Sequence, residues 1–124
     1  MESKQMRSYL ILNKAADLLE NVGWTKGASA RNEEGYPINF GSEKATCFCL
    51  IGAILKAKLM LLGYKFEDED DKWDQSKLNA LNQVSNQLGI ETGLIPLAEW
   101  NDSQQSKKEV VQVLRDAANK GKQQ

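Results

Sequence analysis

Three glycines in this chain each follow an apolar helical pattern and precede a large apolar residue. The three sequences are V-G-W at 22–24, L-G-Y at 62–64 and L-G-I at 88–90. Glycine commonly ends an α-helix because it adopts the left-handed conformation without a Cβ penalty, and the apolar residue after it packs back onto the last turn. The repeated ending predicts three helices and so favours an all-α fold.

Apolar residues at three- and four-residue spacing indicate where these helices begin. The first helix is expected from about Ser3 to Val22. The second is expected to begin at Ser42, a suitable N-cap, and to form the central element because residues 43–62 are apolar almost all round. The third is expected to start at about 74–76 and to end before the last of the three glycines.

The C-terminal third of the chain carries two more helical signals. S-K-K-E at 106–109 is a capping box, and I-P-L-A-E-W at 95–100 predicts one short turn with Pro96 at the first helical position. The tail from about 119 to 124 is expected to fray. We therefore expect a single domain over residues 1–124, an all-α bundle of four to five helices with a long packed loop between the first two.

Composition argues against several classes of protein. The chain has 124 residues, a net charge of −1 and a pI of about 5.5, so one domain is expected and no global field attracts nucleic acid or anionic membrane. The longest apolar stretch, 47–62, contains Lys56 and Lys58 and falls short of the roughly 20 apolar residues that span a membrane. Reduced cysteines and the lack of a targeting signal predict a cytoplasmic protein.

The sequence has few residues in patterns that are typical of catalytic sites. The chain has no histidine, which removes Ser-His-Asp and Cys-His mechanisms and most zinc sites. Cys47 and Cys49 are expected inside the second helix, where burial makes a thiol unreactive. Glu33 and Glu34 are paired carboxylates, but neighbours on a turn are usually just exposed. The acidic stretch 65–74 lacks the glycine and glutamate that an EF-hand loop requires. We expect no catalytic residue, no metal and no cofactor.

The connection between the first two helices is the most distinctive part of the chain. It is longer than structureless loops usually are in compact domains. N-E-E-G at 32–35 predicts a tight turn with Gly35 at positive φ, and K-G-A-S-A at 26–30 is compatible with a helical turn. Residues 36–40, Y-P-I-N-F, are expected to be extended, with their alternating apolar side chains holding the loop against the bundle.

Trp24 and Trp100 are expected to pack at the same end of the bundle, beneath the loop. Gly27 and Gly52 are the expected points of close backbone approach between the loop and the second helix. Two interpretations remain open, since these residues either build the fold or line a polar-edged groove that binds a ligand. The candidate binding residues are Trp24, Arg31, Glu33, Glu34, Tyr36, Trp100, Asn101 and Asp102.

Four segments of the chain resemble a family of small uncharacterised domains from bacteria and their phages. The segments are 24–35, 49–53, 100–102 and 109–110, which match W-x-x-G-A-x-A-R-x-x-x-G, C-x-x-G-A, W-N-D and E-V. The chain departs from that pattern at 103–105, where the family often has a basic or threonine pair. The resemblance implies a fold but no activity. In size and style the chain is also similar to small helical inhibitors that bacterial pathogens pair with ubiquitin-deamidase effectors.

Two functional hypotheses follow. The first is a non-enzymatic interaction module that binds another protein and inhibits or regulates it, with a bacterial effector enzyme as one example of such a partner. An isologous homodimer is expected as well, because the second helix has more apolar surface than its neighbours cover. The second hypothesis is a small-molecule or nucleotide-modifying enzyme whose site lies between the 24–41 loop and W-N-D. A ligand thermal-shift screen beside a protein pull-down separates the two.

Overall fold

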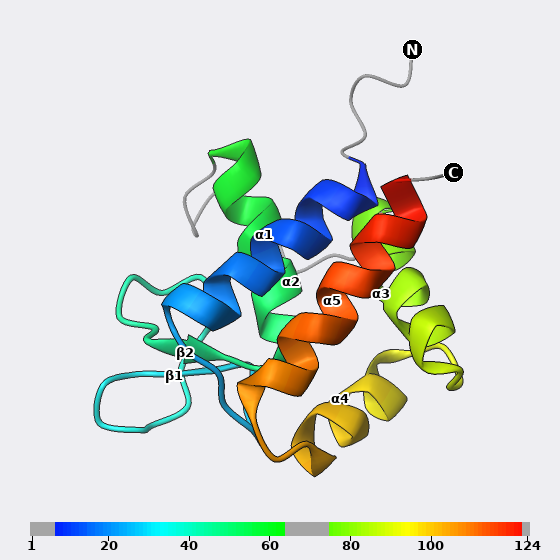
Figure 1. Ribbon diagram of the computed structural model, residues 1–124. Coiled ribbons are helices and arrows are strands. Elements are labelled where there is room, and N and C mark those ends of the chain that lie inside the picture. Colours follow the sequence, from blue (N-terminus) through cyan, green and yellow to red (C-terminus); the bar gives the residue numbers. More distant parts are fainter. Residues whose placement is uncertain (1–6, 64–74, 123–124) are drawn as a thin grey trace.

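The structure, a computed structural model, describes residues 7–63 and 75–122 and confirms the all-α prediction. Within these ranges five helices pack around one apolar core, and a small two-stranded sheet lies beside the start of α2 (Figure 1). Tyr64 and the acidic stretch 65–74 lie outside the described residues. In chain order the elements are α1 (Ser8–Asn21), β1 (Ala30–Arg31), β2 (Cys47–Phe48), α2 (Leu50–Leu62), α3 (Gln75–Leu88), α4 (Leu94–Ser103) and α5 (Lys107–Lys122).

The core is centred on α1. This helix packs against α2, α3 and α5, most extensively against α5. Its inward stripe includes Ile11, Leu12 and Leu19, all fully buried. The second helix, which we expected to be the central element, is buried in its first turns but exposes apolar side chains at its C-terminal end, Met60 and Leu61 among them. The expectation of a central second helix is therefore wrong, whereas the apolar surface that we expected its neighbours to leave uncovered lies at its C-terminal end.

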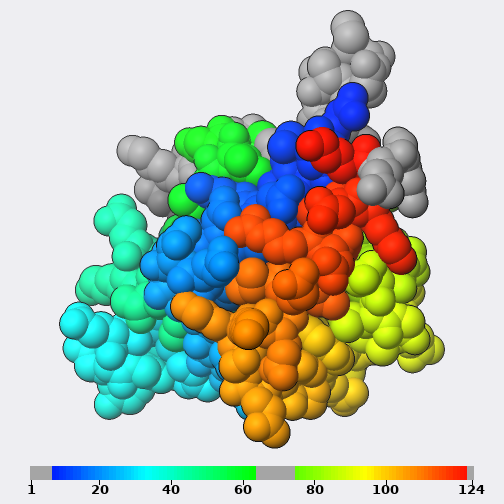
Figure 2. Space-filling view, viewed as in Figure 1, coloured from blue at the N-terminus to red at the C-terminus, as the bar shows by residue number. Residues whose placement is uncertain are grey.

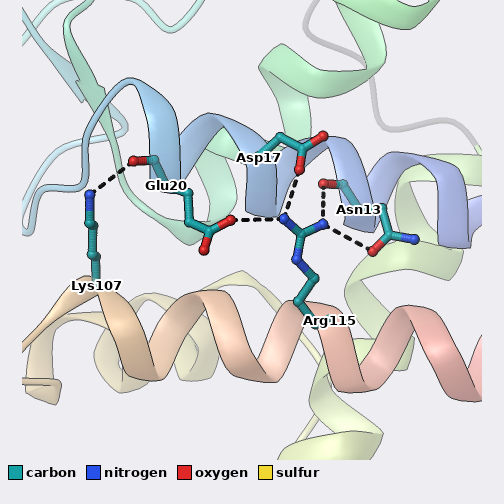
Figure 3. A network of polar contacts seen from close by, with 5 residues as sticks. All are labelled: Asn13, Asp17, Glu20, Lys107 and Arg115. Atoms are coloured by element: carbon teal, nitrogen blue, oxygen red, sulfur yellow. Dashed lines mark hydrogen bonds and ion pairs between the residues drawn. The ribbon is translucent and has the colours of Figure 1, made fainter.

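A polar network fixes α1 against α5 (Figure 3). The Arg115 guanidinium donates to the Asn13 carbonyl oxygen at 3.1 Å and to the carboxylates of Asp17 at 2.7 Å and Glu20 at 2.9 Å. Lys107 donates to the Glu20 carbonyl oxygen at 2.9 Å. Because later residues of α5 contact earlier residues of α1, the two helices run antiparallel. These side chains are partly exposed, so the network contributes more to alignment than to stability.

Two of the three predicted glycine endings are confirmed. Gly63 and Gly89 are left-handed, with φ of 74° and 71°. At the second of these, the Ile90 N–H donates to the Ser85 carbonyl oxygen at 3.1 Å, and Ile90 packs on the core. That pairing is the Schellman ending.

Gly23 ends α1 in a different way. Its φ is 157°, outside the left-handed helical region that we predicted. The reason is the strand that passes it: a Cβ at Gly23 would lie 2.7 Å from the Thr46 carbonyl oxygen. The Phe48 N–H also donates to the Gly23 carbonyl oxygen at 3.0 Å. Gly23 is therefore needed for close approach of two segments.

The predicted start of α2 at Ser42 is wrong. The helix begins at Leu50, and Cys49 is its N-cap. Residues 46–49 instead pair with the loop: β2 lies antiparallel to β1, and the Cys49 N–H donates to the Ser29 carbonyl oxygen at 3.1 Å. The Ser42 hydroxyl accepts from the nearby Lys44 N–H at 3.1 Å, within a turn. Because of this backbone pairing, the helix does not start at the local capping signal, and Cys47 lies in a strand instead of in α2.

The segment before the last helix is more regular than predicted. It forms the ten-residue α4, and Pro96 is its third residue and not its first. W-N-D at 100–102 consequently lies in the second half of α4. One of the two hydrogen bonds of the predicted capping box is present: the Glu109 carboxylate accepts from the Ser106 N–H at 3.1 Å. α5 extends to Lys122 and includes most of the tail that we expected to fray.

The long loop folds back on itself as a small hairpin. The Asn32 N–H donates to the Tyr36 carbonyl oxygen at 2.9 Å, and Gly35 has the predicted positive φ, 89°. Residues 26–29 form bends and not the helical turn that we considered. Ile38 and Phe40 pack on the core as predicted, but Tyr36 is 67% exposed. We name residues 32–36 the hairpin tip.

Candidate functional site

Asn101 joins three separate parts of the chain. It is fully buried, and its side-chain oxygen accepts from the Trp24 indole N–H at 2.8 Å and from the Leu50 N–H at 3.1 Å. Its side-chain nitrogen donates to the Thr25 carbonyl oxygen at 3.2 Å and to the Asp102 carboxylate at 3.0 Å. These four bonds satisfy the whole amide. Asn101 thereby fastens the loop and the first turn of α2 to α4.

The two tryptophans lie at the same end of the bundle, as predicted. Trp24 bonds to Asn101, the residue that follows Trp100. Both indoles are partly buried and pack against the core. The Trp24 N–H has the hydrogen-bond partner that a buried indole requires. Three of the candidate binding residues thus hold the fold together at this end.

Arg31 holds the loop together from within. Its guanidinium donates to the Thr25 hydroxyl at 2.9 Å, to the Gly35 carbonyl oxygen at 3.1 Å and to the Lys26 carbonyl oxygen at 2.8 Å. These contacts tie the base of the loop to the hairpin tip. Arg31, a candidate binding residue from the sequence, therefore uses donors on all three of its nitrogens for intramolecular contacts.

Glu33, Glu34 and Tyr36 belong to the hairpin tip. All three are exposed at the hairpin tip. Glu33 and Glu34 line a hollow of about 490 Å³ together with Glu43 and Lys44. The eight candidate residues therefore divide into a group that stabilises the fold and a group that faces solvent.

A second pocket lies where we expected a groove, between the loop and the W-N-D segment. Its volume is about 290 Å³. Its walls come from three elements: loop residues 27–29, Cys49 and Ile51 at the start of α2, and Ala98, Asn101 and Asp102 of α4. Sequence reasoning missed Ala28, Ser29, Ile51 and Ala98, because small and aliphatic residues carry no chemical signal. We name this the α4 pocket.

The loop forms one wall of the α4 pocket because Gly52 has no side chain. A Cβ at Gly52 would lie 2.0 Å from the Ser29 carbonyl oxygen, so the predicted close approach is confirmed there. Gly27 has another role. Its φ is 79°, and its N–H donates to the Asp102 carboxylate at 3.0 Å. A glycine is therefore needed at position 27 for its positive φ more than for close packing of the loop.

Cys49 faces the α4 pocket as a neutral thiol. Burial raises the pKa of the Cys49 thiol above its ordinary value, and the nearby Asp102 carboxylate adds to the effect. Hydrogen bonds from the amides of Gly52 and Ile51 lower the pKa but do not offset burial. A neutral thiol is a poor nucleophile. The expected lack of reactivity thus has a physical basis, although Cys49 is an N-cap and not a residue inside the helix.

The raised pKa of Cys49 predicts a loss of stability in alkali. The unfolded chain releases the thiol proton near the ordinary pKa of about 8.5, while the folded chain retains it, so the free energy of unfolding should fall as pH rises through and above that value. Cys49→Ser keeps an N-cap oxygen for the Gly52 N–H but does not titrate. Urea unfolding of both proteins between about pH 7 and 10 should show a steeper decline for the wild type. Equal slopes would contradict the raised pKa.

Two general features accompany this geometry. Over residues 7–63 and 75–122, no group of three or more Asp, Glu, Cys or His side chains is arranged to hold a metal ion. In the same part of the chain, every helix is too short or too polar to cross a membrane.

The family of the chain follows from sequence comparison. The family of unknown function DUF6197 matches residues 6–120. The chain belongs to this family. The predicted membership of an uncharacterised family is thereby confirmed. The detailed motif pattern stays a prediction. Comparison with curated proteins and comparison with solved structures gave no match. DUF6197 membership therefore adds no activity, and function must be argued from the geometry.

Proposed function

We propose that the chain is a non-enzymatic interaction module that contacts a partner protein through its hairpin tip, residues 32–36. The observation that carries this proposal is the position of Tyr36. Its side chain is 67% exposed although the sequence alternation predicted it to pack inward. In Figure 2 the cyan loop forms a lobe that protrudes from the body of the molecule. An exposed aromatic side chain on a protruding loop is typical of a protein-binding surface.

The hairpin tip is held in one conformation before any partner binds. The Gly35 N–H donates to the Asn32 carbonyl oxygen at 2.9 Å, and the Tyr36 N–H donates to the Asn32 side chain at 2.9 Å. Arg31 adds its bond to the Gly35 carbonyl oxygen. A loop that is already ordered loses less conformational entropy when it binds. Rigidity therefore favours recognition by the hairpin tip.

Charge indicates which surface the hairpin tip would meet. Glu33, Glu34 and Glu43 surround one hollow, with Lys44 as the basic residue in its lining. The net negative charge there favours a basic surface on the partner, which steers the encounter and disfavours acidic partners. Tyr36 next to these carboxylates supplies apolar contact area. The proposed partner therefore presents a basic patch beside an aromatic or aliphatic one.

A homodimer remains part of the proposal. Met60, Leu61 and Leu62, on the last turn of α2, are each more than a third exposed. Such a group of apolar side chains supports self-association, and light scattering at micromolar concentration tests it.

An enzyme acting on a small molecule remains the second candidate, because the α4 pocket lies where that hypothesis placed a site. Asp102 and Cys49 are the titratable side chains in its lining. The neutral Cys49 thiol is a poor nucleophile and a poor base, so the lining supports binding better than acid–base chemistry.

Site-specific photocrosslinking tests the interaction proposal. Benzoylphenylalanine at position 36 should crosslink a protein in cells that express the chain, whereas the same probe at Gln112, an exposed residue of α5, should not. With the purified partner, Tyr36→Ala should weaken binding at least about tenfold, as for an interface hot spot. Thermal unfolding verifies that the variant is folded. Identical crosslinks at both positions, or unchanged affinity of the variant, would contradict the proposal.

A further inference from the structure

We propose that the α4 pocket binds a primary alkylammonium group, as carried by a lysine side chain or a free aliphatic amine. The pocket holds about 290 Å³. This lies at the lower end of the roughly 300–1,000 Å³ of small-molecule sites, and it suits a short chain better than a nucleotide. None of its lining residues belongs to the hairpin tip, so this proposal stands apart from the proposed function.

The walls of the α4 pocket suit a methylene chain. Ala28 comes from the loop, Ile51 from α2 and Ala98 from α4, and all three contribute aliphatic surface. Long basic side chains bury their methylene stems against such surface while the charged end stays near water. The polar groups of the lining decide whether the pocket binds a cation or an anion.

The start of α2 does not make the pocket an anion site. A free helix N-terminus attracts anions through its unpaired N–H groups. Here the Leu50 N–H donates to Asn101, and the Gly52 N–H donates to the Cys49 sulfur at 3.3 Å. The Ile51 amide also interacts with that sulfur. Side chains thus already satisfy the N–H groups that would bind an anion.

Asp102 supplies the formal charge of the pocket lining. Its Oδ1 accepts from the Gly27 N–H and from Asn101, each at 3.0 Å. Its Oδ2 accepts no hydrogen bond from any residue within 7–63 and 75–122. The Asp102 side chain is exposed, so an incoming cation reaches it without displacing a protein group.

The fold does not require the negative charge of Asp102. The residue lies at the C-terminal end of α4, where the helix dipole disfavours a carboxylate. An asparagine there would accept the same two hydrogen bonds through its amide oxygen. A carboxylate that lies in an unfavourable position and lines a largely aliphatic pocket is the arrangement that a primary ammonium group complements.

Titration with n-butylammonium followed by NMR tests the proposal on the intact chain. The probe should shift the backbone amides of Gly27, Ala28 and Ile51 and should saturate at millimolar concentration. n-Butanol, which has the same chain without charge, should bind about five- to tenfold more weakly, and n-butyrate should not bind. Equal binding of butanol, or binding of butyrate as tight as that of butylammonium, would overturn the proposal.

Two variants separate the contribution of charge from that of the aliphatic walls. Asp102→Asn should weaken butylammonium binding about five- to tenfold and leave butanol binding unchanged. Ala98→Met should fill the pocket and abolish binding of both probes. The thermal unfolding midpoint shows that each variant is folded. Unchanged butylammonium affinity in Asp102→Asn would show that the charge has no role.

Peptide probes distinguish the two sources of the ammonium group. Acetyl-Gly-Lys-Gly-amide should shift the same amides as butylammonium if a lysine side chain is the natural ligand, and its norleucine analogue should not. Binding of butylammonium without binding of the lysine peptide would assign the pocket to a free amine. Tyr36→Ala should leave every one of these titrations unchanged, so failure at the hairpin tip and failure at the α4 pocket are distinguishable.

Discussion

Gly52→Ala should lower the free energy of unfolding by more than about 3 kcal/mol, a large effect for the addition of one methyl group. The new Cβ would lie 2.0 Å from the Ser29 carbonyl oxygen, and neither backbone can yield without disturbing its own hydrogen bonds. The loop would have to leave α2, which would also break the bond from the Cys49 N–H to that carbonyl oxygen. Equilibrium urea unfolding measures the change.

Gly63→Ala is the matched control for Gly52→Ala. Gly63 has a φ of 74°, and no atom of residues 7–63 or 75–122 lies within 4 Å of its added Cβ, so alanine there introduces backbone strain without a clash against the described part of the chain. Its expected cost is about 1 kcal/mol. The difference between the two variants isolates the contact between the loop and α2. Equal costs would mean that the loop does not lie against α2 at Gly52.

Asn101→Ala should lower the free energy of unfolding by about 3–5 kcal/mol. The substitution leaves the Trp24 indole N–H, the Leu50 N–H and the Thr25 carbonyl oxygen without their partner. Each buried polar group without a partner costs about 1–3 kcal/mol, and water entering the gap recovers part of that. The emission of Trp24 should also shift, because its polar contact is lost. Thermal and urea unfolding monitored by fluorescence give both measurements.

Asn79→Ala is the control for Asn101→Ala. Asn79 is exposed on α3, and its side chain accepts one bond, from Gln75. Its loss should cost less than about 0.5 kcal/mol. A cost at Asn101 as small as that at Asn79 would contradict the joining role assigned to its side chain.

The helices that local signals specify could be predicted from sequence. α3 ends at Leu88, directly before Gly89, and α5 begins at Lys107, directly after the cap residue Ser106, as expected. Both signals, a glycine after an apolar stretch and a capping box, act within a few residues. The start of α2 could not be predicted. Ser42 carries the local cap signal, but residues 46–49 are paired with the loop. No local pattern shows which distant backbone will supply that pairing.

The candidate site was partly predictable for the same reason. The expectation that Trp24 and W-N-D meet at one end rested on helix order, and the bond between Trp24 and Asn101 agrees with it. Which candidate residues stabilise the fold and which face solvent could not be predicted. Arg31 looks like a ligand-binding side chain in the sequence, yet its partners are the Thr25 hydroxyl and two backbone carbonyl oxygens of its own loop. Tyr36 looked like a residue that anchors the loop, and it faces solvent.

The antiparallel pairing of α1 with α5 has a consequence for biosynthesis. Translation produces α1 first of the five helices and α5 last, yet α1 packs more extensively against α5 than against any other helix. Until α5 has left the ribosome, α1 lacks the cover that α5 gives it in the folded protein. The core is therefore completed late in synthesis. Until then the nascent chain exposes apolar surface of the kind that holdase chaperones bind.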